Sequence, residues 1–443
     1  MLFKKKDYEE RLRILKQEMK AQDVDLFIIY GDEFRRENLR YMTNYWPIFE
    51  RGLLVISHDR EPILLVSPEC EHIARNDSIW KDIRLIQDVG MAYVPEEVEF
   101  TNVMFTSMAT VFEELIEGKT SKVFVSGLDA MCKNLYDRIE VALGKNVAII
   151  NGDSILYSMR RIKSENEIRA LKKAWEICDI GYRAVLNADI IGLTEIQAAA
   201  IAEKAARDAG AEAIIFSLFA AGEQRTNIVV ARASEHKIQK GDMIMFAFAV
   251  QYEGYIASDE WPFVAGGEPS EAQLNLIKCL VFAEDFGVKA IKEGVPQGSV
   301  VKSIRRYFKE NGMEKYDLYP PIHGNGLAEA ESPYPDENSK EIFKSGIGIN
   351  FDVSLFGVPG VGSNRIEEGF IVLESGLLAL SPLISSLREE FIQTKREEKR
   401  LSEYVNSISG GVLLIFIALF SLLSGELSFR GGDPIFTQSD GDD

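Results

Sequence analysis

The sequence contains little cysteine, and the cysteines it has form no recognisable pair. All four, Cys70, Cys132, Cys178 and Cys279, lie far apart, without a CxxC motif or a short disulfide spacing. A disulfide framework or a cysteine-based zinc site needs clustered cysteines, so the pattern argues against both. Scattered thiols of this kind are typical of reducing compartments, and we therefore predict a cytoplasmic protein.

An excess of positive charge is also missing. The chain carries 50 Lys and Arg against 69 Asp and Glu, which gives a formal net charge of −19. Nucleic-acid phosphates would be repelled by this charge, and no basic cluster offsets it, so no nucleic-acid partner is expected. The N-terminal stretch is basic but lacks the apolar region of a signal peptide. The charge favours a cationic or zwitterionic small substrate.

The patterns that are present predict two domains and a tail. From residue 24, short β-branched strands alternate with helical stretches until about residue 157, as in an α/β domain. Ser164 and Glu167 then form a capping box at the start of a helix. Further on, the unbroken apolar run from Met243 to Val250 predicts a strand covered on both faces. We predict domains over residues 1–157 and 158–386, followed by a charged helix and an apolar tail over residues 387–443.

The apolar part of the tail has several interpretations. Residues 405–425 carry no charged side chain, and this length is near the roughly 20 residues that a membrane helix needs. Basic residues at 395, 396, 399 and 400 would keep the main body cytoplasmic. A membrane anchor is one interpretation. A second interpretation is an amphipathic or buried apolar segment that packs on a neighbouring part. A third is a tail that does not belong to the enzyme body formed by the two domains.

Several motifs in the second half occur together, in a fixed order. They are KGDMIMFAFAVQYEGY, HGNGL and NRIEEGFIVLESG, preceded by RRIKSENEIRALKKA at the start of the predicted second domain. With these motifs the chain resembles the creatinase, prolidase and aminopeptidase P family, over about residues 8–385. The resemblance implies an α/β creatinase-like N-terminal domain, an α+β pita-bread C-terminal domain, and a homodimer.

The resemblance also implies positions for two metal ions, which metal-dependent members hold with two Asp, one His and two Glu. In this chain the five positions fall on Ala247, Ser258, His323, Asp352 and Glu367. Neither alanine nor serine supplies a bridging carboxylate, and such a site needs hard anionic oxygens. We therefore predict no intact two-metal site. A single divalent metal on His323, Asp352 and Glu367 stays open.

The pattern of site residues is closest to that of creatinase, a family member that works without metal. Creatinase binds its substrate's guanidinium group through carboxylates at positions that match Glu260 and Asp352, and such pairs form strong charge-assisted hydrogen bonds. The resemblance thus implies a catalytic set of Glu260, Asp352 and His323, with His323 transferring protons as an acid or base. The residues predicted to contact the substrate are Glu367, Arg365, Glu331 and Asn227.

Other positions depart from the family pattern. The general-base histidine of creatinase falls on Val229, and a second histidine of the peptidases falls on Ala330, although Glu331 keeps the following acid. Arg225 is a further candidate for contact with a substrate carboxylate. Asp259 points away from its neighbours by strand alternation, so we expect it at the surface or behind the site.

These residues predict a metal-independent hydrolase that cleaves a C–N bond of a small cationic or amide substrate, or of a short peptide. Two alternatives stay open. One is an inactive pita-bread protein that only binds its ligand, which the loss of two ligand acids and a loop histidine favours. The other is an Xaa-Pro metallopeptidase with a rebuilt metal site.

Overall fold

The computed structural model describes residues 2–92, 99–116, 122–144 and 146–407. The chain divides into two compact units, residues 1–386 and residues 387–443. Helix α12 (Pro382–Ser407) begins in the first unit and continues into the second. Beyond residue 407, the apolar tail segment lies outside the described residues. Within the described ranges, no helix has the length and apolar character needed to cross a membrane.

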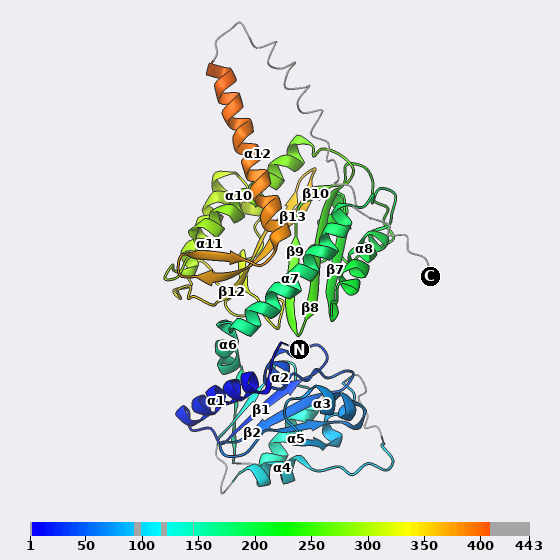
Figure 1. Ribbon diagram of the computed structural model, residues 1–443, viewed down its shortest axis with the longest axis vertical. Coiled ribbons are helices and arrows are strands. Elements are labelled where there is room, and N and C mark those ends of the chain that lie inside the picture. The colour runs from blue at the N-terminus through cyan, green and yellow to red at the C-terminus, as the bar shows by residue number, and fades with distance from the viewer. Residues whose placement is uncertain (1, 93–98, 117–121, 145, 408–443) are drawn as a thin grey trace, which may run out of the picture. The chain divides into compact units, whose positions relative to one another are not determined.

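A six-stranded mixed sheet forms the first part of the body (Figure 1). Its strand order is β4-β3-β2-β1-β5-β6, with β1 antiparallel to β2 and parallel to β5. The strands are β1 (Leu26–Gly31), β2 (Gly52–Ile56), β3 (Ile63–Val66), β4 (Ile83–Leu85), β5 (Lys122–Ser126) and β6 (Ala148–Asn151). The helices are α1 (Lys5–Ala21), α2 (Glu37–Thr43), α3 (Glu71–Asp77), α4 (Met108–Leu115), α5 (Lys133–Leu143) and α6 (Asp153–Arg161), with 3-10 turns η1 (Pro68–Cys70) and η2 (Gln87–Val89).

Alternate residues of β1 hold the first sheet to its helices. Leu26 and Ile28 are fully buried and belong to one apolar cluster with Val111 and Phe112 of α4. Successive strand residues point to opposite faces, so Phe27 lies on the other side, where its ring packs edge-on against Phe124. Burial of apolar area on both faces therefore stabilises this sheet.

A second, larger sheet follows in the chain. Its order is β10-β8-β9-β13-β12-β11, with β7 paired to β8 and β14 paired to β13. The strands are β7 (Ala213–Ala221), β8 (Met243–Tyr252), β9 (Tyr255–Glu260), β10 (Phe263–Val264), β11 (Ile322–Gly324), β12 (Gly348–Val358), β13 (Gly362–Leu373) and β14 (Gly376–Ala379). The helices are α7 (Glu165–Leu186), α8 (Glu195–Asp208), α9 (Glu223–Thr226), α10 (Glu271–Ala290) and α11 (Gln297–Glu310), with η3 (Glu314–Tyr316).

The local signals in this part have the predicted form. Strand β8 contains the apolar run Met243 to Val250, and all of these residues are buried. Ser164 is the N-cap of α7: its hydroxyl accepts the backbone N–H of Glu167, whose side chain accepts the N–H of Ser164 at 2.9 Å. The capping box thus satisfies two backbone donors at the helix start. The exact domain limits at residues 157 and 386 stay predictions.

Helices α7 and α10 pack against one face of the second sheet (Figure 1). A Cβ atom built on Gly181 of α7 would lie 2.5 Å from the ring of Phe248 on β8. A Cβ atom on Gly287 of α10 would likewise lie 2.5 Å from the ring of Phe351 on β12. Because side chains alternate along a strand, the residues beside these two phenylalanines point away from the helices.

Helix α7 and strand β13 approach each other closely at Gly369 of β13. A Cβ atom there would lie 2.1 Å from Cζ2 of the buried Trp175 on α7. We expect Gly369→Ala to lower the free energy of unfolding by about 1–3 kcal/mol, because the indole or the helix must shift. Gly267→Ala is the control, since its Cβ would meet only Lys240 Cε at 3.6 Å. Equal urea midpoints for the two variants would contradict this close packing.

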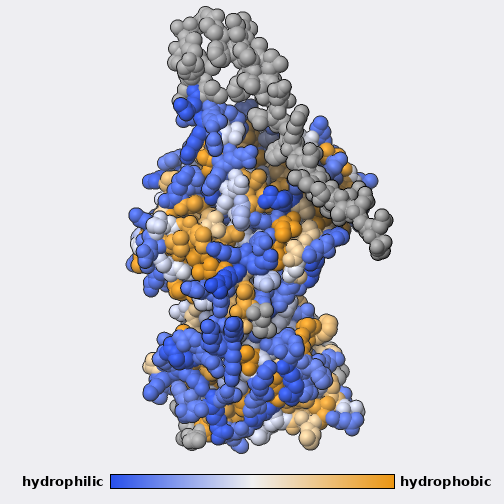
Figure 2. All heavy atoms as spheres, viewed as in Figure 1, coloured by the Kyte–Doolittle hydropathy of each residue, from blue (hydrophilic) through white to orange (hydrophobic). Residues whose placement is uncertain are grey.

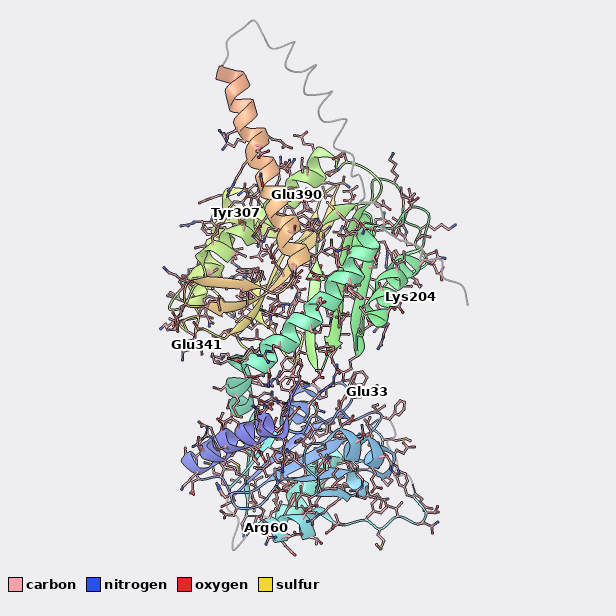
Figure 3. All side chains as sticks on the ribbon, in the orientation of Figure 1. Glu33, Arg60, Lys204, Tyr307, Glu341 and Glu390 are labelled. Carbon is pink, nitrogen blue, oxygen red and sulfur yellow. The ribbon has the colours of Figure 1, made fainter. Side chains whose placement is uncertain are left out.

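Polar residues cover most of the face shown in Figure 2, over both sheets. Charged side chains such as Lys204 on α8 and Glu341 project outward in Figure 3, and these two side chains are 77% and 61% exposed. Many of the chain's acids are therefore solvated. The acids inside the second sheet need a separate explanation.

Candidate active site

Four residues form one row across adjacent strands of the second sheet. Ala247 on β8 pairs with Glu260 on β9, Glu260 pairs with Glu367 on β13, and Glu367 pairs with Asp352 on β12. Residues directly opposite each other in antiparallel strands point to the same face. The row therefore places three carboxyl groups on the face opposite α7 and α10. Glu260 stands directly beside Ala247, the position that lacks an acid.

The row borders a cavity of about 200 Å³. Phe216, Leu218 and Val230 contribute apolar surface, and Tyr319 and Tyr334 also line it. Its charged lining residues are Glu260, His323, Glu329, Asp352, Arg365 and Glu367. The structure thus brings together five of the residues predicted from the sequence and adds Glu329.

Arg365 lies between two of these carboxyl groups. Its Nε is 3.1 Å from Glu260 Oε2, and its Nη1 is 3.8 Å from Asp352 Oδ2. Its Nη1 also donates to the Tyr319 hydroxyl at 3.1 Å, and its Nη2 donates to the Val229 carbonyl at 2.8 Å. Burial lowers the pKa of Arg365, but the two carboxylates outweigh it and raise that pKa above its ordinary value. Arg365 is therefore a fixed internal cation.

Glu260 and Asp352 nevertheless keep oxygens available. Within the described residues, both side-chain oxygens of Glu260 and Oδ1 of Asp352 make no hydrogen bond. Burial raises the pKa of both carboxyl groups, and Arg365 only partly reverses this. Buried carboxylates with unused acceptor capacity favour a ligand that carries positive charge or donates hydrogen bonds.

Glu367 is held from two sides. Its Oε2 accepts the hydroxyl of Ser258 at 2.9 Å, and its Oε1 accepts the amide of Asn350 at 2.7 Å. Ser258 stands at one of the two positions where the family pattern has an aspartate. The serine therefore supplies a hydrogen-bond donor to Glu367 where a metal-dependent relative would place another carboxylate.

His323 on β11 is surrounded by acids. Its Nδ1 donates to the Gly324 carbonyl at 3.0 Å, while Nε2 lies 3.5 Å from Glu367 Oε1 and 3.6 Å from Glu329 Oε1. The Tyr334 ring stacks on the imidazole at a centroid distance of 5.8 Å. Burial lowers the pKa of His323, but Glu329, Glu367 and Asp352 raise it to about 10. The charged imidazolium, which can donate a proton, is thus the favoured form.

Glu329 is the site residue that sequence reasoning missed. Its side chain is 28% exposed at the cavity, and burial raises its pKa to about 7 although His323 opposes the shift. The available signal was its place beside Ala330, where the peptidases carry a histidine. An acid next to a position that has lost its histidine can replace that histidine in the site. Only the conformation of the loop shows that the Glu329 side chain points into the cavity.

Other predicted residues do not reach the cavity. Glu331 points instead toward Arg160 and Lys163, accepting from Lys163 Nζ at 2.8 Å. Asn227 accepts the hydroxyl of Ser363 at 2.9 Å, outside the cavity lining. Arg225 is paired with Glu195 at 2.8 Å.

Asp259 lies behind the site and is fully buried, so the part of the expectation that placed it at the surface is wrong. It is on the α7 side of the sheet, near Asp179. Burial, and then the charge of Asp179, raises the pKa of Asp259 well above its usual value. Strand alternation correctly predicted that the Asp259 side chain points away from the site. That face of the sheet is covered by helix α7, so the side chain is buried there and does not reach the surface.

Comparison with known proteins identifies the family. Residues 11–162 match the creatinase/prolidase N-terminal domain, and residues 169–374 match metallopeptidase family M24. The chain belongs to the creatinase, prolidase and aminopeptidase P family. The predicted family and its pita-bread fold, with a creatinase-like N-terminal domain, are therefore confirmed. The family assignment places the chain among hydrolases.

Individual relatives agree with this. An Xaa-Pro dipeptidase of Pyrococcus furiosus is 26% identical over 302 residues, which are 66% of this chain and 85% of the relative. The uncharacterized peptidase YqhT of Bacillus subtilis is 29% identical over 218 residues, 49% of this chain and 61% of that protein.

Two solved structures share the fold. The prolidase of Pyrococcus horikoshii OT3 has a TM-score of 0.71 at 21% identity, covering 84% of this chain and 98% of the prolidase. The X-Pro aminopeptidase of Thermotoga maritima has a TM-score of 0.71 at 23% identity, covering 84% and 97%.

Metal-dependent members of the family hold divalent metal ions, and the side chains that line this cavity match that use only in part. A bridged pair of ions does not fit: two of the five positions are Ala247 and Ser258, and the cation Arg365 already lies beside Glu260 and Asp352. One ion fits better. His323, Glu329 and Glu367 offer ligand atoms within 4.8 Å of one another, the single such group among the described residues. This trio contains Glu329 in place of Asp352, the third ligand suggested by the sequence.

Proposed function

We propose that this protein is a hydrolase that cleaves a C–N bond of a small cationic or amide substrate, without a bridged pair of metal ions. The observation that carries the proposal is the charge of the cavity, which is lined by four carboxyl groups and one arginine. Burial raises the pKa of Glu260, Asp352 and Glu329, so these groups ionise most readily when a positive charge enters beside them. A positively charged group is therefore attracted into the cavity.

Each residue has a role that follows from its placement. Glu260 Oε1 and Asp352 Oδ1, which make no hydrogen bond within the described residues, bind the positive or N–H-bearing group of the substrate. His323 donates a proton to the leaving nitrogen, because its Nε2 faces the cavity between Glu329 and Glu367. Glu329, which is partly exposed, orients the attacking water and accepts its proton as the C–O bond forms and the C–N bond breaks. Phe216 and Leu218 contact the apolar part of the substrate.

A one-metal Xaa-Pro peptidase is the second candidate, and the trio of His323, Glu329 and Glu367 favours it. These three residues would hold the ion, which supplies Lewis-acid activation of water or of an amide carbonyl when bound. Under either candidate we propose a cytoplasmic homodimer that takes a small molecule or short peptide.

Glu260→Gln is expected to lower kcat/KM by about 10–100-fold, because a charge-assisted hydrogen bond to the substrate becomes a neutral one. Asn227→Ala is the matched control and should keep the kinetics of the unaltered protein, since Asn227 lies outside the cavity. The substrate is first found by thermal-shift screening of guanidino compounds, betaines and Xaa-Pro dipeptides, followed by assay of the hits. Full turnover by Glu260→Gln would contradict the assigned role.

Elemental analysis and calorimetric titration with Mn²⁺, Co²⁺ and Zn²⁺ separate the candidates. Cationic hits that still bind and turn over after chelator treatment support the first candidate. One ion per chain, bound more weakly by Glu329→Gln, supports the second. Two ions per chain overturn both. Binding of every hit without turnover overturns the hydrolase proposal in favour of a protein that only binds its ligand.

A further inference from the structure

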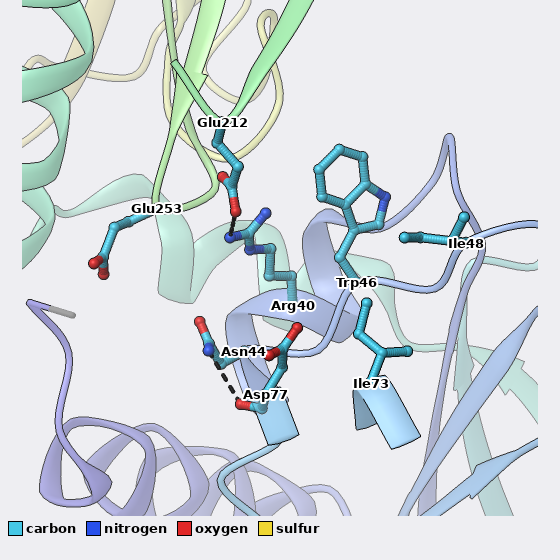
Figure 4. Close-up of a pocket in the computed structure, with 8 residues that line it drawn as sticks. All are labelled: Arg40, Asn44, Trp46, Ile48, Ile73, Asp77, Glu212 and Glu253. Carbon is cyan, nitrogen blue, oxygen red and sulfur yellow. Dashed lines mark hydrogen bonds and ion pairs between the residues drawn. The ribbon is translucent and has the colours of Figure 1, made fainter. Parts of the chain in front are cut away.

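The acids that line a cavity beside α2 and α3 already have partners inside the protein. Figure 4 shows this cavity, which has a volume of about 300 Å³. Glu212 pairs with Arg40 at 2.5 Å, and Glu253 accepts the backbone N–H of Leu2 at 3.0 Å. Asp77 accepts the side-chain amide of the preceding residue at 2.7 Å. The cavity beside the row of site acids (the row cavity), whose acids keep oxygens without a hydrogen bond, is therefore the better candidate for a charged ligand.

The row of site residues continues beyond Ala247 onto β7. Leu218 on β7 pairs with Ala247, which pairs in turn with Glu260 on β9. Residues opposite each other in antiparallel strands point to the same face, and both Leu218 and Ala247 line the row cavity. The row thus runs from an apolar end at Leu218 to an acidic end formed by Glu260, Glu367 and Asp352.

The apolar end offers little to a water molecule. Phe216 lies two positions before Leu218 on the same strand, so both side chains point to one face, and Val230 also lines this cavity. The side chains of these three residues and of Ala247 carry no hydrogen-bonding group. An ordered water needs about two to four polar partners. An apolar group of a ligand is therefore favoured at this end.

Exposed apolar side chains stand at the mouth of the row cavity. Val230 and Tyr334 line the cavity although they are 67% and 51% exposed. Arg365 Nη2 donates to the carbonyl of Val229 at 2.8 Å, which fixes the backbone next to Val230. The Tyr334 ring stacks on the imidazole of His323. Residues of the site thus hold the rim, and its apolar surface continues the apolar end of the row out to solvent.

From this arrangement we infer that the substrate is amphipathic, with an alkyl chain of several carbon atoms attached to its positive group. The positive group binds Glu260 and Asp352. The chain passes over Ala247 and Leu218 and leaves the cavity beside Val230. Neighbouring strands lie about 4.8 Å apart, so Leu218 is roughly 10 Å from Glu260 along the row, a distance for a chain rather than a methyl group. The inference rests on the proposed function, which supplies the binding of the positive group.

The test is isothermal titration of the full chain with methylguanidinium, propylguanidinium and hexylguanidinium, which share a cationic group and differ only in chain length. Each added methylene group should tighten binding about threefold, so hexylguanidinium should bind at least about 30-fold more tightly than methylguanidinium. Equal affinity for the three probes would overturn the apolar subsite and leave the cationic site standing. No binding of any probe would overturn the proposed function and the inference with it.

Variants locate the chain. Leu218→Asn should weaken hexylguanidinium about tenfold and leave methylguanidinium unchanged, because only the chain loses an apolar contact. Val230→Asn changes an exposed side chain, so it keeps the test valid if Leu218→Asn unfolds, and it should weaken hexylguanidinium about threefold. Val141→Asn is the matched control, because Val141 on α5 is 81% exposed and does not line the cavity. Unchanged hexylguanidinium affinity in both Leu218→Asn and Val230→Asn would overturn the inference.

Glu260→Gln tests the positive end separately. It should weaken all three probes by one common factor of about tenfold and keep the dependence on chain length, because only the charged group loses strength. Unchanged affinities in Glu260→Gln, with the chain-length dependence intact, would overturn the assigned role of Glu260 and still support the apolar subsite.

Discussion

Arg365→Met is expected to lower the free energy of unfolding by about 3–5 kcal/mol at neutral pH, because it leaves buried carboxylates without their counter-ion. Arg365 is only 8% exposed and contacts both Glu260 and Asp352. Methionine matches the length of the side chain but not its charge. Denaturant unfolding followed by circular dichroism measures the loss.

The loss should shrink as the pH falls. Without Arg365, the folded-state pKa values of Glu260 and Asp352 rise further above those of the unfolded chain, so the folded variant binds more protons and gains stability toward acid. Arg305→Met is the matched control: Arg305 pairs with Asp317 and Glu337, but its side chain is 31% exposed, and we expect a cost of about 1 kcal/mol or less. Equal losses in the two variants would show that Arg365 is not the counter-ion of the site.

Glu331→Gln should have an effect of similar size. Its side chain is 7% exposed and joins Arg160 and Lys163, which are 3% and 1% exposed. Removing the one charge between two buried cations is expected to cost about 3–5 kcal/mol in unfolding free energy. A Glu331→Gln protein that still folds should keep the ligand binding of the row cavity, because Glu331 does not line it.

This second effect also shrinks in acid, but for a different reason. Burial raises the pKa of Glu331, but Arg160 and Lys163 outweigh it, so the folded-state pKa is lowered. The stabilisation is therefore present above the unfolded pKa and is lost as the pH falls through the folded one. The difference between the unaltered protein and Glu331→Gln should narrow in acid. Glu341→Gln is the control, since Glu341 pairs with Arg161 at 61% exposure and its loss should cost about 1 kcal/mol or less.

Much of the site was predictable because its residues lie at fixed offsets from recognisable strands. The family resemblance identified Ala247 and Ser258 as the positions without acids, and the alternation along β9 placed Glu260 on the same face as Ser258. The strand register then brings Ala247 and Glu260 into one row. The contribution of Glu329 was not predictable, because it lies in a loop whose conformation follows no period.

The amino-acid order alone predicted the apolar strand Met243 to Val250 and the capped helix at Ser164, because each depends on residues close together in the chain. The order of several motifs indicated the family, and the resemblance to that family identified the missing acids of the metal positions. Only the folded chain decided which charges meet. Glu331 is drawn away from the cavity by Arg160 and Lys163, which are 171 and 168 positions distant. Arg365 reaches Glu260 across more than a hundred residues in the same way. Charge pairs of this kind depend on how distant segments pack, and no local period of the sequence records that.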